Sequence, residues 1–140
     1  MKQKHMSVKE ILEYARWFEL QMDAKMVQLE RLKDLEQSVL SLGCMEESEH
    51  FGESQDGVLE KIGKMAEQLF GEMLDLLDIR IRLMHLIGTL GHLRQQTVMV
   101  RRYLLNEEWS CIAEDLECSE EEVHQLHEKA LKNLKKTNKQ

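Results

Sequence analysis

Proline is absent from the 140 residues of this chain, and glycine occurs only 7 times. Both residues interrupt helices, so their scarcity removes the usual break points. Aromatic residues make up only 5% of the chain, whereas leucine, methionine, glutamate, glutamine and lysine are plentiful. This composition is typical of long helices. We therefore predict an all-α protein.

A basic region is also lacking. The chain has 19 Lys and Arg against 26 Asp and Glu, a net charge of −7, and residues 43–57 contain five acidic side chains and no basic one. Proteins that bind nucleic acid through its phosphates usually carry a positive patch. The charge balance therefore argues against strong autonomous binding to DNA.

Four further absences exclude classes of function. No run of apolar residues is long enough for a membrane span, and the three cysteines form no CxxC pair. We expect a cytoplasmic protein with reduced thiols and no membrane contact. The spacing of Cys118, His124 and His127 fits no standard zinc set, and no phosphate loop or catalytic constellation is recognisable. We expect no metal, no cofactor and no enzymatic activity.

Apolar residues recur with a heptad-like spacing along two stretches of the chain. The first predicts an N-terminal long helix over residues 1–42, which begins at Ser7 with a capping box to Glu10 and ends before Gly43. An acidic loop follows over residues 43–57, and a second long helix over 58–94, with a break near Gly88 and Gly91.

The two long helices either fold back on each other as an antiparallel, coiled-coil-like hairpin or pair with a second chain. Periodicity does not separate these arrangements. Lys25 interrupts the apolar stripe of the first helix. Gly63 and Gly71 lie inside the second helix, where they either weaken it or mark a close approach of helices.

The last segment, residues 95–140, has the parts of a helix-turn-helix domain. We expect a helix over 95–105, a second over 107–116 capped by Asn106, a tight turn at 117–119, and a last helix capped by Ser119. Ala113 is small enough for the helices to cross closely. The apolar residues that would join the helices are Ile112, Leu116, Val123 and Leu126.

The string SEEEVHQLHEKALKNL, residues 119–134, resembles the recognition helix of sigma-70 region 4. Nearly the whole chain is similar to a family of phage and prophage proteins described as sigma-70 region-4-like. The residues that carry this resemblance are Val8–Leu12, Arg102-Tyr103, Trp109, Ile112, Ala113, Leu126, His127, Ala130 and Leu131. The resemblance implies a regulator of phage late-gene or prophage transcription that contacts DNA, RNA polymerase or both.

One departure from the family weakens the DNA-reading part of this expectation. The positions of Glu120 and Glu122 are typically arginine in sigma-70 region 4, and that of His124 often is. Acidic side chains suit a helix N-terminus but repel a phosphate backbone. The predicted DNA-binding residues are Arg101, Arg102, Glu121, His124, Gln125, Lys129 and Lys132.

The alternative is a protein-interaction or inhibitor module that keeps the fold without DNA binding. Its acidic surface would bind a basic host protein or imitate DNA. In either case the long helices are candidates for forming a homodimer.

Overall fold

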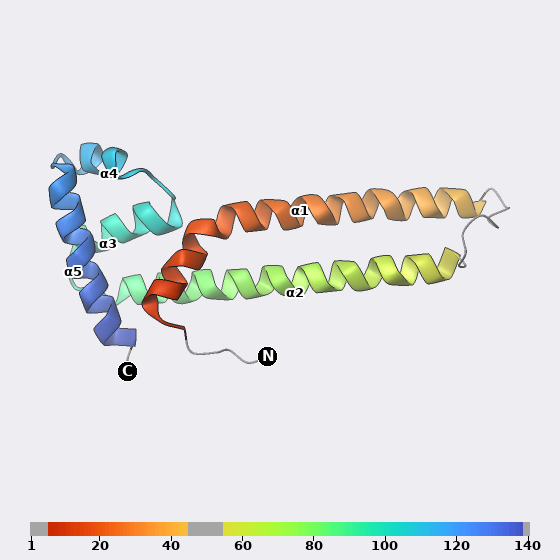
Figure 1. Ribbon diagram of the computed structural model, residues 1–140, viewed down its shortest axis with the longest axis horizontal. Coiled ribbons are helices and arrows are strands. Elements are labelled where there is room, and N and C mark those ends of the chain that lie inside the picture. Colours follow the sequence, from red (N-terminus) through yellow and green to blue (C-terminus); the bar gives the residue numbers. More distant parts are fainter. Residues whose placement is uncertain (1–5, 45–54, 139–140) are drawn as a thin grey trace. The chain divides into compact units, whose positions relative to one another are not determined.

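The computed structural model describes residues 6–44 and 55–138, in which every regular element is helical (Figure 1). The elements are α1 Val8–Cys44, α2 Gln55–Gly88, α3 Leu93–Met99, the short π-helix η1 Val100–Leu104, α4 Trp109–Leu116 and α5 Glu120–Asn138. None of these helices combines the length and the apolar character needed to cross a membrane. The all-α prediction is confirmed.

The chain divides into two compact units. Unit 1 comprises residues 1–19 and 77–140, and unit 2 comprises residues 20–76. The helix-turn-helix segment therefore shares unit 1 with the first turns of α1 and the last turns of α2. Most of the predicted acidic loop, residues 45–54, lies outside the described residues.

Unit 2 contains the middle and end of α1 and the greater part of α2, which run antiparallel (Figure 1). Its buried hydrophobic residues are Val39, Ile62, Leu69 and Leu76. Lys25, which interrupts the heptad pattern, forms an ion pair of 2.8 Å with Glu72 of α2. This cross-helix pair explains how a lysine is accommodated in the seam. Of the two arrangements expected for the long helices, the antiparallel hairpin is confirmed (Figure 1).

The two glycines inside α2 do not mark a close approach of helices. A Cβ atom added to Gly63 or Gly71 would meet no heavy atom within 4 Å. Of the two interpretations of these glycines, close packing is therefore wrong. Both residues leave the helix backbone less restrained than alanine would.

Unit 1 begins with the predicted capping box. The amide of Ser7 donates to Glu10 Oε1 at 3.0 Å, and the amide of Glu10 donates to Ser7 Oγ at 3.2 Å. The first turns of α1 then contribute to a core that also contains residues of α2, α3 and α5. Its buried members are Val8, Ile11, Leu12, Ala15, Leu83, Ile87, Leu90, Met99, Ala130 and Leu134.

The segment between α3 and α4 differs from the expected single helix over 95–105. The backbone widens into η1 at Val100, where the amide of Leu105 donates to the carbonyl of Val100. The predicted cap at Asn106 is wrong, because α4 begins later and its N-cap is Glu108. Asn106 instead adopts a left-handed φ of 59°, a conformation that asparagine tolerates better than most residues. Its side-chain oxygen accepts a hydrogen bond from Arg16.

Candidate nucleic-acid interface

The turn between α4 and α5 is closed by local hydrogen bonds. Glu117 has a left-handed φ of 57°, and the amide of Cys118 donates to the carbonyl of Ala113 at 3.0 Å, as in a Schellman motif. The amide of Ser119 donates to Glu122 Oε1 at 3.0 Å, and the amide of Glu122 donates to Ser119 Oγ at 3.1 Å. The second predicted capping box is confirmed, and it fixes where α5 begins.

A small apolar core holds α4 against α5. Ile112 and Ala113 of α4, Val98 of α3 and Val123 of α5 are buried together. Trp109, Leu116, Cys118 and Leu126 pack around them. The predicted joining residues therefore meet as expected, with Leu116 and Leu126 at the margin of this core.

Trp109 is surrounded by ionisable side chains. The guanidinium of Arg102 lies 4.2 Å from the centre of its ring, and the rings of His124 and His127 lie 4.5 and 4.9 Å away. Tyr103 Oη is hydrogen-bonded to His127 Nε2 at 2.8 Å. Burial, followed by the charges of His124 and Arg102, lowers the pKa of His127. The cluster therefore favours a neutral His127 against the indole.

Four predicted DNA-binding residues share the outer face of α5. Glu121, Gln125, Lys129 and Lys132 are all exposed, and their spacing of four, four and three residues places them on one side of the helix. The buried residues of this helix, on its opposite side, are Val123, Ala130 and Leu134. His124 is also exposed, but it lies to the side of this face, against Trp109.

The charge of α5 changes sign along its length. Its first turn contains Glu120, Glu121 and Glu122, whereas its last turn carries Lys135 and Lys136. Both placements are favourable for the helix dipole. The end of the helix that enters the major groove in a typical helix-turn-helix is consequently the acidic end.

The two predicted arginines of η1 are engaged within the domain. Arg101 Nε lies 3.0 Å from Glu107 Oε1, and Arg101 Nη2 lies 2.5 Å from Asp115 Oδ2. Burial alone would lower the pKa of Arg101, but these two carboxylates outweigh it and raise the pKa. Arg102 donates to the carbonyl of Glu107 at 3.1 Å. Arg101 is thus paired with two carboxylates of the domain, whereas Arg102 lies over the ring of Trp109, which also contacts His124.

Arg94, which the sequence pattern did not single out, does lie near that face. It lines a polar cleft of about 410 Å³ together with Gln125, Lys129 and residues of the α4–α5 turn. The other lining residues are Glu117, Cys118, Glu122 and Leu126. Only its position would have indicated Arg94 as a candidate, because it lies just before the predicted start of the domain and in the first turn of α3.

These features define a helix-turn-helix module, with a tight left-handed turn, a capped second helix and a shared apolar core. Residues 93–136 match the protein family described as Sigma-70, region 4. This segment is therefore similar to sigma-70 region 4, a class of DNA-binding regulatory domain. No curated protein and no solved structure matches the chain.

Proposed function

We propose that the chain is a phage-derived transcription regulator whose α5 contacts DNA, in concert with RNA polymerase. The observation that carries the proposal is the exposed row of Gln125, Lys129 and Lys132 on a capped helix of a sigma-70 region 4-like domain. Gln125 is suited to reading an adenine, because a glutamine amide matches the donor and acceptor of that base. The lysines supply phosphate contacts.

In this proposal the phosphate contacts lie away from the acidic start of α5. Arg94 and Lys129 line the same cleft, and Lys132 follows one turn further along the helix. Three such contacts correspond to a slope of about −3 in a plot of log affinity against log salt concentration. Binding by a single domain should thus be weak at physiological salt, and a partner or a second copy would be needed for stable occupancy.

A direct test measures fluorescence anisotropy of labelled fragments from the genome that encodes the chain, first at low salt. Gln125→Ala should weaken specific binding by roughly 5- to 150-fold, the cost of one lost base contact of about 1–3 kcal/mol. Lys129→Ala should weaken binding to all sequences and reduce the salt slope by about one. Lys33→Ala, an exposed lysine of unit 2, is the matched control. Absence of salt-sensitive binding by the unaltered protein would overturn the proposal.

The acidic start of α5 favours a second candidate, a protein-interaction or inhibitor module. Glu117, Glu120 and Glu121 are exposed near one end of α5, a charge pattern suited to a basic protein partner. The double variant Glu120→Gln with Glu121→Gln separates the two functions and spares the capping residue Glu122. It should tighten DNA binding several-fold if α5 faces phosphates. It should leave DNA binding absent, and weaken binding to a basic partner, if α5 faces a protein.

We further propose that unit 2 forms a homodimer. Its described residues leave nine large hydrophobic side chains exposed, which are Leu20, Met26, Val27, Leu35, Leu40, Leu42, Met65, Phe70 and Leu74. A second hairpin packed against this one would cover the stripe of α1 that contains Leu20, Val27, Leu35 and Leu42, as in a four-helix bundle. Light scattering after size exclusion should give twice the chain mass, and Val27→Glu with Leu35→Glu should give one chain mass. Lys33→Glu is the control for added negative charge.

A further inference from the structure

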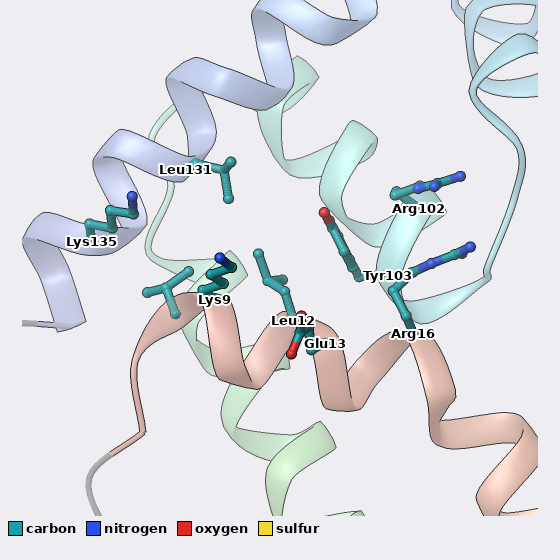
Figure 2. Close-up of a pocket in the computed structure, with 9 residues that line it drawn as sticks. Lys9, Leu12, Glu13, Arg16, Arg102, Tyr103, Leu131 and Lys135 are labelled. Carbon is teal, nitrogen blue, oxygen red and sulfur yellow. The ribbon is translucent and has the colours of Figure 1, made fainter.

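Unit 1 contains a second hollow, distinct from the polar cleft beside Gln125. It has a volume of about 370 Å³, near the lower end of the range for small-molecule sites. Its apolar lining comes from Val8 and Leu12 of α1, Tyr103 of η1 and Leu131 of α5. Figure 2 shows Leu12, Tyr103 and Leu131 pointing into a common space from three helices.

The margin of this hollow is strongly basic. Lys9, Arg16, Arg102 and Lys135 line it, against the single carboxylate of Glu13. In Figure 2 the two lysines lie at one side of the hollow and the two arginines at the other. Four cations thus face one anion around this hollow, although the net charge of the whole chain is −7.

Within the described part of the chain, none of these four cations forms an ion pair with a carboxylate. Arg16 donates to the amide oxygen of Asn106, and Arg102 donates to the backbone carbonyl of Glu107 at 3.1 Å. Burial lowers the pKa of Arg102, and the nearby charge of Arg16 lowers it further. The positive charges of Arg16 and Arg102 therefore repel each other, and they add to the positive potential that Lys9 and Lys135 create around the hollow.

We propose that this hollow binds a small anionic amphiphile, a carboxylate on an apolar chain or ring. The apolar body would lie between Leu12, Tyr103 and Leu131, and the carboxylate would face Lys9 and Lys135, whose ammonium groups carry three rotatable donors each. The ligand would touch α1, η1 and α5 at once. It would thereby stabilise the packing of α5 within unit 1.

Isothermal titration of the full-length chain tests the proposal with decanoate, kept below its micelle concentration. Decanol supplies the apolar body without the charge, and acetate supplies the charge without the body. Decanoate should bind at one site per chain and at least tenfold more tightly than either. Equal affinity for decanoate and decanol, or no binding of decanoate, would overturn the proposal.

Variants locate the site. Lys9→Gln with Lys135→Gln changes only exposed side chains, so the fold should be kept. It should weaken decanoate binding tenfold or more and leave decanol unaffected. Leu131→Trp should fill the hollow and abolish binding. The control pair Lys33→Gln with Lys64→Gln removes two exposed charges from unit 2 and should change nothing. Amide shifts in NMR spectra that fall on residues 20–76 instead of the hollow would refute the site.

DNA binding does not enter these measurements. The ligand proposal and the proposed function can accordingly fail separately.

Discussion

Among the described residues, unit 1 buries fifteen hydrophobic side chains, whereas unit 2 buries four and leaves nine large ones exposed. The buried residues of unit 1 come from α1, α2, α3, α4 and α5, so each apolar face meets several others. Unit 2 has only two helices, and each of them buries one stripe of its side chains against the other. The same heptad-like sequence pattern thus yields a completed core in one unit and an unfinished one in the other.

The largest expected effect tests the completed core of unit 1. Leu134 of α5 is fully buried, and Leu134→Ala should lower the free energy of unfolding by about 2–5 kcal/mol through lost burial and a residual cavity. Leu35→Ala, at an exposed position of unit 2, should cost far less in dilute solution. Chemical denaturation measures both. A cost for Leu35→Ala that grows with protein concentration would show that a second copy completes unit 2.

Unit 2 can be strengthened without adding any contact. Gly63→Ala and Gly71→Ala should each raise the free energy of unfolding by about 0.5–1 kcal/mol, because alanine is a better helix former and space for its methyl group exists. Thermal unfolding followed by circular dichroism measures the gain. A loss of stability in either variant would indicate that another molecule packs against that glycine.

In unit 1 a substitution to glycine should raise the free energy of unfolding at one position, Glu117. Glu117 has a left-handed backbone, which costs about 1–2 kcal/mol for a residue with a Cβ atom. Glu117→Gly should relieve this strain. The gain is reduced by about 0.4–1 kcal/mol, because glycine gives the unfolded chain more conformational freedom. We expect a net gain of about 0.5–1 kcal/mol. Glu114→Gly, inside α4, is the matched control and should be destabilising by a similar amount.

The smallest expected effect is a dependence of the stability of unit 1 on pH. Burial lowers the pKa of His127 below its ordinary value of 6.5, so the unfolded chain takes up this proton first as the pH falls. The contribution of His127 to stability is complete above about pH 6.5 and decreases as the pH falls towards the folded-state pKa. His127→Phe should lose this dependence, whereas His92→Gln at an exposed position should keep it. Urea unfolding at pH 7.5 and 5.5 provides the comparison.

Features set by neighbouring residues were predictable from the sequence. The capping boxes at Ser7 and Ser119 each need only a serine and a glutamate three residues later, and both form. The turn at Glu117 and the break near Gly88 follow from equally local signals. Periodicity over longer stretches predicted the two long helices, but it left open whether they pair with each other or with a second chain.

Features set by distant residues were not predictable. The end of η1 depends on contacts such as the bond from Arg16 to Asn106, which joins positions 90 residues apart. Arg101 was a natural candidate for a phosphate contact because nothing local reveals the carboxylate of Asp115 beside it. The basic hollow draws on three helices that are far apart in sequence, so no single segment carries its pattern.

Trp109 gives the domain an internal optical reporter. Its indole touches Arg102 of η1 and both histidines of α5, so any shift of α5 changes the surroundings of this one chromophore. The other tryptophan, Trp17, is 57% exposed, and Trp17→Phe would leave Trp109 as the single emitter. Its fluorescence emission would then report how α5 packs in the domain during titration with DNA, ligand or acid, and no attached dye would be needed.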